Sequence, residues 1–257
     1  MKILVTGYKG FIGGNMLRYL QEKTDHEVTT FEWGEPHPVV EGLDWVMHIG
    51  AISATTERDV DKVMRQNYDF TVNLYDECVK HNVNFQFSSS ASVYGLGTEF
   101  KETSPVDPRT PYAWSKYMVE RYIQQHPSSN SIAQCFRYFN VFGPGEDHKG
   151  TQASPFYQFT QQKLNNGNIK VFQGSDKYRR DFIHVDDVIS TQMKFLKAKD
   201  SGIFNVGTGT TTSFKHIAQV FSVPIIEIPM PEQLKNSYQT YTCADTTLLN
   251  KTLKKIK

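Results

Sequence analysis

The chain has 257 residues, of which 39% are hydrophobic and 13% aromatic, enough for one large α/β domain or for one domain with a small lobe attached. Its 28 Lys and Arg residues balance 27 Asp and Glu residues, and no basic run marks a nucleic-acid-binding face or a membrane-surface helix. The three cysteines are widely spaced, and no apolar stretch has the length of a signal segment or a membrane span. We therefore expect a cytoplasmic protein that binds a small molecule, with no metal site, no nucleic-acid partner and no membrane contact.

The N-terminus is typical of a strand, a tight turn and a helix, because three regularly spaced glycines separate an apolar run from residues of helical period. Gly7 would permit the turn, Gly10 would let the backbone approach a pyrophosphate, and Gly13 would let the helix pack closely on the strand. Phe11 and Ile12 open the helix, whose free N–H groups would point at the anion. The spacing predicts a dinucleotide site, against the alternative of an ordinary connection between a strand and a helix.

The second predicted strand, Glu27–Glu32, ends in an acidic residue about 20 residues beyond the glycines. A dinucleotide site needs an acceptor for the adenosine ribose hydroxyls at this place, and a carboxylate would repel the additional phosphate of NADP. Glu32 therefore favours NAD as the cofactor, with NADP left open. The alternative is a solvated residue at the end of a strand.

The next predicted strand, Asp44–Ile49, follows too soon for a complete βαβ unit. Only residues 33–43 lie between, including two prolines, whereas a crossover with its helix needs about a dozen residues or more. We therefore expect a sheet that lacks an outer strand, in which Val28–Phe31 forms the edge and residues 34–43 cross directly. The adenine end of the cofactor should then be unusually exposed unless a partner subunit covers it, and free NAD should bind with modest affinity.

A long amphipathic helix is predicted over Glu57–His81, where apolar residues recur along one face. Asn67 interrupts that face, either as a packing detail or as a side chain that steadies the loop after a neighbouring strand. The following strand, Val83–Phe87, runs into the serine-rich segment Ser88–Gly95. A segment at the carboxyl end of a strand lies where open α/β sheets bind their ligands.

Tyr112 and Lys116 share one face of a helix predicted to begin at Pro111. A phenol with a pKa of about 10 is a poor proton carrier at neutral pH, but a nearby ammonium and a positively charged nicotinamide would both favour the phenolate. The pair is therefore a candidate acid/base. An exposed pair on a helix surface would look the same in isolation, but the glycine turn and the serine segment favour the catalytic interpretation.

These motifs together resemble the extended short-chain dehydrogenase/reductase family, whose nucleotide-sugar epimerases carry TGxxGxxG, SSSxxxYG and YxxxK. The resemblance implies that Ser90 binds the reacting hydroxyl or carbonyl of the substrate, that Tyr112 is the acid/base and that Lys116 holds the nicotinamide ribose. It implies three further residues at the cofactor: Gly50, Ala51 and Asn67.

The second half of the chain is similar to the ADP-L-glycero-D-manno-heptose 6-epimerases within this family. The similarity is carried by HKG at 148–150, LNNG at 164–167 and Leu-Lys-x-x-Tyr-Gln at 234–239. These segments are more specific than the glycine turn, and the resemblance covers nearly the whole chain.

That similarity implies roles for five residues at the substrate. Asn140 and Arg180 would bind its pyrophosphate, and Tyr238 would contact the nucleotide-sugar. Lys149 becomes a second acid/base candidate that also binds substrate, the alternative being a solvated loop cation. Gln158 stands at a substrate position where those epimerases carry a histidine, so the sequence leaves the sugar open.

We expect a Rossmann-like, doubly wound parallel α/β sheet formed mainly by residues 1–140, with a smaller α/β substrate lobe formed mainly by residues 141–257. Segments near 182–206 should return to the main domain as strands. The implied reaction is epimerisation of a nucleotide-activated sugar, by NAD(P)-dependent oxidation to a ketone and re-reduction, in a homo-oligomer.

Two other functions stay open at this point. A reductase or dehydratase of the same family would share the glycine turn and YxxxK, although Ala91 and Ser92 stand after Ser90 where a dehydratase would carry an acidic pair. A non-enzymatic dinucleotide-binding regulator is the second alternative, and the presence of both Tyr112 and Lys116 argues against it.

Overall fold

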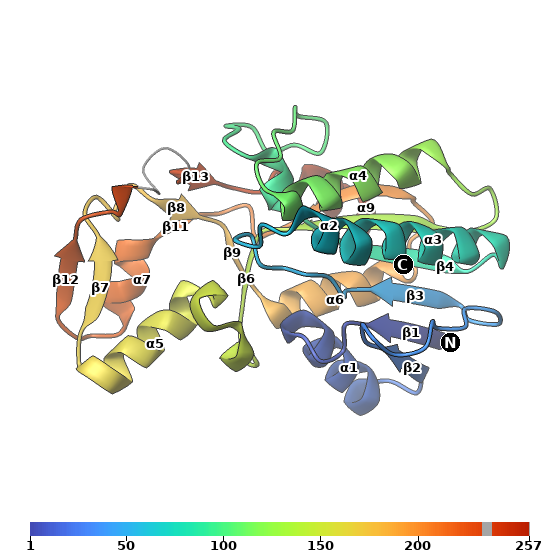
Figure 1. Ribbon diagram of the computed structural model, residues 1–257, viewed down its shortest axis with the longest axis horizontal. Coiled ribbons are helices and arrows are strands. Elements are labelled where there is room, and N and C mark those ends of the chain that lie inside the picture. Colours follow the sequence, from blue (N-terminus) through green and yellow to red (C-terminus); the bar gives the residue numbers. More distant parts are fainter. Residues whose placement is uncertain (233–237, 257) are drawn as a thin grey trace.

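Six parallel strands form the central sheet, in the spatial order β2-β1-β3-β4-β5-β10 (Figure 1). The computed structural model describes residues 1–232 and 238–256. The strands of this sheet are β1 Lys2–Thr6, β2 Glu27–Phe31, β3 Trp45–His48, β4 Asn84–Ser90, β5 Ala133–Tyr138 and β10 Gly202–Val206. The chain moves outward from β1 to β2 and then returns to β3 on the other side of β1, so the strand order reverses there. Doubly wound sheets bind ligands at such a reversal.

Helices cover both faces of the sheet, with α1 and α6 on one face and α3 and α4 on the other (Figure 1). The α-helices are α1 Phe11–Lys23, α2 Val60–Val63, α3 Phe70–Lys80, α4 Pro111–Gln125, α5 Pro155–Asn166, α6 Val185–Phe195, α7 Phe214–Val220 and α9 Thr247–Leu253. Shorter 3-10 segments are η2 Ala91–Tyr94 and η3 Asp147–Gln152. This is the Rossmann-like α/β fold that the sequence predicts.

Side chains of β1 alternate between the two helical layers. Leu4 packs with Leu74 of α3, whereas Ile3 packs with Met16 of α1 and Ile189 of α6. A strand inside a parallel sheet is buried on both faces, which is why the first strand is an uninterrupted apolar run in the sequence.

β2 is the outer strand on its side of the sheet and pairs only with β1 in the described part of the chain. The interval 32–44 contains turns in place of a helix and a further strand, and Val40 from this interval packs into the core. For the described residues, the prediction of a sheet without one outer strand and with Val28–Phe31 at its edge is therefore confirmed.

The predicted helix over Glu57–His81 consists of α2, a π-helical turn η1 at Met64–Asp69, and α3. It begins at Val60 because the carboxylate of Asp59 accepts a hydrogen bond from the backbone N of Lys62 at 2.9 Å. The π-helical turn contains Asn67, the residue that interrupts the apolar face. Such turns are frequent at functional sites.

The smaller lobe, with β7, β12, α5 and α7, forms the left part of Figure 1. Its short strands are β6 Asn140–Phe142 with β9 Phe182–His184, β7 Ile169–Phe172 with β12 Ile225–Ile228, and β8 Arg179–Arg180 between β11 Thr212–Ser213 and β13 Tyr241–Thr242. Of the segments expected to return as strands, β10 joins the central sheet, whereas β9 pairs with β6 outside it. Within the described residues, no helix has the length and apolar character needed to cross a membrane.

Candidate active site

The glycine turn after β1 lies directly against the loop after β3. Gly7 has a φ of +71°, and a Cβ atom on it would lie 2.3 Å from the Cα of Gly50. A Cβ atom on Gly13 would lie 2.0 Å from the carbonyl oxygen of Gly7, so α1 packs closely on the turn. Because these contacts are to backbone atoms, neither position accepts a larger residue. This is the geometry that the predicted turn and packing roles require.

Helix α1 begins at a glycine, with no side chain capping its N-terminus. Gly10 is the N-cap residue of this 13-residue helix, and no side chain caps it. A Cβ atom on Gly10 would meet only the carbonyl oxygen of Gly7, at 3.2 Å. The first N–H groups of α1, which include those of Phe11 and Ile12, have no partner within the helix and would bind the pyrophosphate of NAD.

Glu32 follows β2 and turns its carboxylate toward the glycine turn. Oε2 accepts a hydrogen bond from the backbone N of Lys9 at 3.1 Å, and Oε1 accepts one from the backbone N of Trp33 at 3.2 Å. A cavity of about 110 Å³ lies beside it, lined by Thr6, Gly7, Phe31, Glu32, Trp33, His48, Gly50, Ala51, Ile52, Gln66 and Phe70. The structure thus brings four predicted cofactor residues together around one cavity: Gly7, Glu32, Gly50 and Ala51.

Asn67 fastens the loop that follows β3. Its Oδ1 accepts a hydrogen bond from the backbone N of Ile52 at 2.8 Å, and its Nδ2 donates to the carbonyl oxygen of Ile52 at 3.0 Å and to Oγ of Ser115 at 3.1 Å. Ser115 lies on α4, next to the candidate acid/base. Of the two interpretations of Asn67, the structure therefore supports the one in which it steadies a loop.

Ser90, Tyr112 and Lys116 meet at the carboxyl edge of the sheet. Lys116 is 3% exposed, and its Nζ donates a hydrogen bond to the carbonyl oxygen of Ser88 at 2.7 Å. The same Nζ lies 5.8 Å from the centroid of the Tyr112 ring, and Tyr112 is hydrogen-bonded to Ser90. Tyr112 and Lys116 are therefore packed against β4 and do not form an exposed pair on a helix surface.

Burial shifts the pKa values of both groups. It lowers the pKa of the Lys116 ammonium to about 7, with the carboxylate of Glu120 opposing the shift. It raises the pKa of the Tyr112 phenol, and the hydrogen bond with Ser90 offsets part of this. The sequence predicted the opposite direction for Tyr112, and the difference arises because burial removes more solvation from the phenolate than its neighbours replace. A positively charged nicotinamide would still act in the predicted direction.

A buried ion pair supports the sheet edge between α4 and β5. Arg137 donates two hydrogen bonds to the Glu120 carboxylate, at 2.9 and 2.6 Å, and Ser89 donates a third. The guanidinium carbon of Arg137 also lies 4.8 Å from the centroid of the Tyr94 ring. The sequence does not reveal this pair, because an acid on a helix and a base on a strand carry no signal of their pairing.

Lys149 lies over the first residue of α1. Its Nζ is 4.9 Å from the centroid of the Phe11 ring and 3.7 Å from Oε2 of Glu146. Glu146 is 1% exposed, and its carboxylate also accepts hydrogen bonds from the backbone N of Gly143 and from the backbone N and Oγ of Ser154. Burial lowers the pKa of Lys149, with Glu146 opposing the shift. Lys149 is therefore a half-buried amine beside the cofactor helix and not a solvated loop cation.

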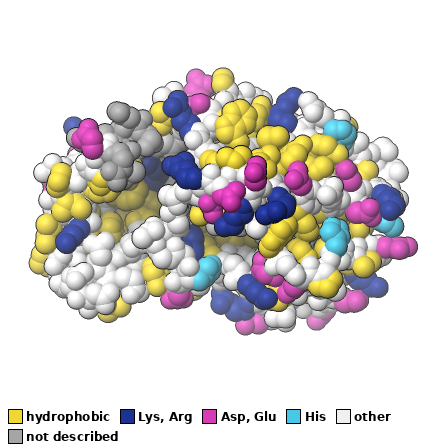
Figure 2. Space-filling view, viewed as in Figure 1, with side chains coloured by type: hydrophobic (Ala, Val, Ile, Leu, Met, Phe, Trp, Pro, Cys, Tyr) yellow, Lys and Arg dark blue, Asp and Glu magenta, His cyan; other side chains and the backbone are white. Residues whose placement is uncertain are grey.

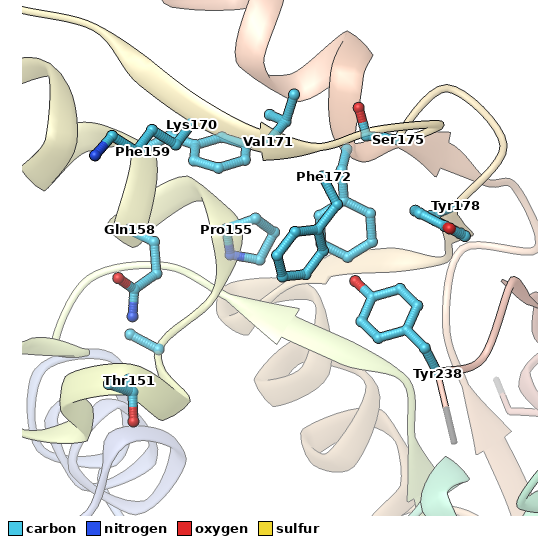
Figure 3. Close-up of a pocket in the computed structure, with 12 residues that line it drawn as sticks. Thr151, Pro155, Gln158, Phe159, Lys170, Val171, Phe172, Ser175, Tyr178 and Tyr238 are labelled. Carbon is cyan, nitrogen blue, oxygen red and sulfur yellow. The ribbon is translucent and has the colours of Figure 1, made fainter. Parts of the chain in front are cut away.

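A second cavity, of about 330 Å³, lies in the smaller lobe and is lined by Thr151, Ala153, Pro155, Gln158, Phe159, Lys170, Val171, Phe172, Ser175, Tyr178, Phe214 and Tyr238. Figure 2 shows a recess with hydrophobic side chains on this side of the molecule. In Figure 3, Gln158 faces the cavity from one side and Tyr238 from the other. Gln158 also donates from Nε2 to the carbonyl oxygen of Gly150 at 2.7 Å, so it supports the HKG segment from α5.

Arg180 is a buried cation without an acidic partner among the described residues. It is 7% exposed, and its guanidinium carbon lies 5.6 Å from the centroid of the Phe214 ring and 5.3 Å from that of Tyr238. It donates to the carbonyl oxygens of Arg179 and Gln239, and burial lowers its pKa. A buried guanidinium with only neutral partners is suited to bind an anion such as a pyrophosphate.

Asn140 is hydrogen-bonded to the residue that follows Arg180 in the chain. Its Nδ2 donates to the carbonyl oxygen of Asp181 at 3.2 Å. The Asp181 carboxylate is fully buried and accepts hydrogen bonds from Thr208 N at 2.8 Å and Gly209 N at 2.9 Å, which fixes this corner of the lobe. Residues 234–237 of the predicted Leu-Lys-x-x-Tyr-Gln segment fall outside the described residues.

Solved structures of nucleotide-sugar enzymes share this fold. The ADP-L-glycero-D-manno-heptose-6-epimerase of Helicobacter pylori has a TM-score of 0.87 at 24% sequence identity, over 98% of this chain and 90% of that chain. The UDP-N-acetylglucosamine 4-epimerase of Methanobrevibacter ruminantium has a TM-score of 0.88 at 22% identity, over 98% and 91%. An NAD-dependent NDP-hexosamine 5,6-dehydratase of tunicamycin biosynthesis has a TM-score of 0.80 at 24% identity, over 98% and 90%. At these identities the likeness shows the fold and leaves the reaction open.

The sequence itself matches a family description over most of its length. The description is "NAD dependent epimerase/dehydratase family", and the match covers residues 3–207. That range includes the glycine turn, the serine segment, Tyr112, Lys116 and the HKG segment. The chain therefore belongs to the NAD-dependent epimerase/dehydratase family.

Proposed function

We propose that the protein is an NAD-dependent epimerase of a nucleotide-activated sugar, acting by oxidation to a ketone and re-reduction. The observation that carries this proposal is that Ser90, Tyr112 and Lys116 lie at the same sheet edge as the open glycine turn. β1 and β4 are separated only by β3, and the three parallel strands end at this edge. A sugar carbon beside Ser90 and Tyr112 would therefore face the nicotinamide end of a dinucleotide whose pyrophosphate lies at the turn.

The protein groups handle the protons, and the bound cofactor supplies a reversible hydride acceptor. Tyr112, as the phenolate, takes the proton of the sugar hydroxyl while the ketone forms, and returns it when the ketone is reduced. Ser90 donates a hydrogen bond to the same oxygen. Lys116 binds the nicotinamide ribose, and its ammonium form favours the phenolate.

Lys149 supplies a second proton carrier from a different element, η3. Burial lowers its pKa, which makes this amine easier to deprotonate than a solvated lysine. An epimerase presents both faces of one ketone to the hydride, so it benefits from carriers on two elements. A simple reductase needs only one carrier, so proton transfer by Lys149 would distinguish the epimerase from a reductase.

The smaller lobe would hold the nucleotide part while the sugar turns over. Arg180 binds the pyrophosphate through its guanidinium, with Asn140 beside it, and Tyr238 contacts the nucleotide-sugar at the 330 Å³ cavity. Gln158 faces the same cavity and replaces the histidine of the heptose epimerases, so it is placed to alter the choice of sugar. Anchoring at the pyrophosphate leaves the sugar free to rotate.

A dehydratase is the main alternative, because one of the solved structures with this fold is a dehydratase. Elimination of water needs an acid and a base beside the ketone-forming group. Here Ser90 is followed by Ala91 and Ser92, and neither side chain is an acid or a base at neutral pH. This sequence favours epimerisation. A regulator without activity would not need Tyr112 packed beside a buried Lys116.

The proposal is tested by incubating the protein and NAD with ADP-heptose and with UDP-, GDP- and dTDP-hexoses, followed by NMR of the sugar stereochemistry. We expect inversion at one carbon of one substrate class with no net change in the absorbance of the reduced cofactor. Net formation or consumption of reduced cofactor would identify a dehydrogenase or reductase, and a product lighter by one water would identify a dehydratase. Tyr112→Phe serves as the inactive control in every reaction.

A further inference from the structure

His48, the last residue of β3, is a buried polar side chain that the proposed reaction does not use. It is 2% exposed, and its ring stacks against Phe85 and Phe87, with centroids 5.9 and 6.0 Å away. Both ring nitrogens have a hydroxyl partner at 2.7 Å: Nδ1 contacts Oγ1 of Thr6, and Nε2 contacts Oγ1 of Thr71. Each imidazole nitrogen is therefore hydrogen-bonded inside the core.

The surrounding hydrogen bonds determine which nitrogen carries the proton. Thr71 donates its only hydroxyl hydrogen to the carbonyl oxygen of Asn67, at 2.6 Å. Its Oγ1 can therefore only accept from His48, so Nε2 carries the hydrogen. At the other end, Thr6 Oγ1 accepts a hydrogen bond from the backbone N of Gly50 at 3.2 Å, and its own hydrogen is free to go to Nδ1.

This directed chain of hydrogen bonds joins the two halves of the site. It starts at Thr6, just before the glycine turn, passes through His48 and Thr71, and ends on the carbonyl oxygen of Asn67 in the π-helical turn. The side chain of Asn67 contacts Oγ of Ser115, and Ser115 Oγ donates to the carbonyl oxygen of Tyr112 at 2.8 Å. One set of contacts therefore runs from the glycine turn after β1 to helix α4, which carries Tyr112.

We propose that His48 is a positioning residue for the cofactor, and that its Nε2–H tautomer fixes the glycine turn and the loop after β3 relative to the helices that carry Asn67 and Tyr112. The inference rests on the NAD site alone and holds whichever sugar the protein uses. Because Gly7 and Gly50 are in backbone contact, a shift at either end of this chain of hydrogen bonds changes the space that receives the pyrophosphate. His48 moves no proton during the reaction.

The electrostatics agree with a permanently neutral ring. Burial, together with the positive charge of Lys116, lowers the pKa of His48 to about 3. Lys116 is the charged group that acts on the ring, whose aromatic contacts are Phe70, Phe85 and Phe87 and whose hydrogen-bond partners are Thr6 and Thr71. A histidine kept neutral in this way behaves as a fixed donor and acceptor.

The first test is ¹⁵N NMR of histidine-labelled protein in the absence of any sugar, with His48 assigned as the signal that is lost in His48→Gln. We expect the Nε2–H pattern, unchanged from pH 5 to pH 9. An Nδ1–H pattern, or titration within this range, would overturn the proposal. Because no reaction is measured, the outcome is independent of the proposed epimerase activity.

The second test compares NAD affinity in variants by calorimetry. His48→Phe keeps a ring and removes both polar atoms, and we expect the Kd for NAD to rise about tenfold, as the loss of two hydrogen bonds implies. His48→Gln restores one acceptor and one donor and should recover most of the affinity. Equal NAD affinity in the wild type and in His48→Phe would refute the positioning role, as would a His48→Gln variant no better than His48→Phe.

Thr71→Val keeps the test decisive if His48→Phe does not fold. The change conserves side-chain shape and removes the hydroxyl that accepts from Nε2–H of His48 and donates to the carbonyl oxygen of Asn67, so NAD should again bind about tenfold more weakly. Thr160→Val is the matched control, because Thr160 makes the same type of bond, to the carbonyl oxygen of Phe156 at 2.8 Å, on α5. If both threonine variants bind NAD like the wild type, the chain of hydrogen bonds does not position the cofactor.

Discussion

Glu146 and Lys149 form an ion pair in which Oε2 and Nζ are 3.7 Å apart and the carboxylate is almost completely buried. The same carboxylate is hydrogen-bonded to Gly143 and Ser154, which lie on either side of the HKG segment. Burial lowers the pKa of Lys149 and Glu146 raises it, so the acid sets how readily this amine loses its proton.

Replacing Glu146 by Gln should therefore move the pH dependence of the reaction. Without the carboxylate the pKa of Lys149 falls further, the neutral amine persists to lower pH, and the limb of the kcat profile that depends on Lys149 shifts to lower pH. Asp147→Asn is the control, because Asp147 lies next in the chain and contacts Tyr157 instead. A limb that stays in place, or that moves to higher pH, would remove Lys149 from the proton transfers.

Tyr112→Phe should abolish turnover and leave NAD binding nearly intact, because the ring still packs and only the proton carrier is lost. The kcat is measured with the substrate found by NMR, and NAD binding is measured by calorimetry. The kcat of Lys149→Ala is measured in the same assay, to show whether both groups transfer protons in the reaction. If Tyr112→Phe keeps more than a small fraction of the rate, the main acid/base is Lys149.

Arg180→Ala should mainly raise the KM for the nucleotide-sugar. Loss of a charge-assisted contact of roughly 1.5–3 kcal/mol corresponds to an increase of about tenfold to a hundredfold. Arg179→Ala is a matched control, because this exposed neighbour donates to Thr211 and does not face the two rings around Arg180. An unchanged KM in Arg180→Ala would show that the buried guanidinium serves the fold and not the substrate.

Arg137→Met should destabilise the protein by about 3–5 kcal/mol, because it leaves the buried Glu120 carboxylate without its cation. The free energy of unfolding in urea measures this, and the double change Arg137→Met with Glu120→Leu should recover part of the loss. Lys80→Met breaks the exposed pair with Glu77 and should cost at most about 1 kcal/mol. Equal effects of Arg137→Met and Lys80→Met would contradict the role of the buried pair.

The parts that the sequence predicted correctly depend on local spacing. Gly7 lies in the turn after the first strand, and Gly13 lies in the helix that follows it. Tyr112 and Lys116 lie one helical turn apart. The missing strand follows from counting the residues after Glu32. A short interval cannot hold a helix and a strand whatever its composition.

The parts that the sequence could not predict depend on partners far away in the chain. His48 is a polar residue in an apolar strand, which is a signal, but its partners Thr6 and Thr71 lie 42 and 23 residues away. The strand β9 has only three residues, and its pairing with β6 is decided by the packing of the smaller lobe. The pKa of Tyr112 depends on burial, which spacing does not reveal.

The last prediction concerns the adenine end of NAD, at the edge strand β2. No further strand of the described chain covers this end, and the cavity beside Glu32 is lined by Trp33 and Phe70, whose rings meet edge to face at 5.7 Å. Trp33 is 45% exposed, so an adenine stacked on it would stay partly in water and gain only about 0.5–1.5 kcal/mol. The nicotinamide end should therefore supply much of the affinity.

We accordingly expect ADP-ribose to bind at least about tenfold more weakly than NAD, and Trp33→Ala to weaken NAD binding by no more than about tenfold. Calorimetry measures both affinities, and quenching of tryptophan fluorescence by NAD should be lost in Trp33→Phe but kept in Trp114→Phe, a control on α4 with a similar exposure of 48%. Tight binding of ADP-ribose to the monomer would contradict this account. Binding that becomes tight only at concentrations where subunits associate would instead show that a partner subunit covers the adenine.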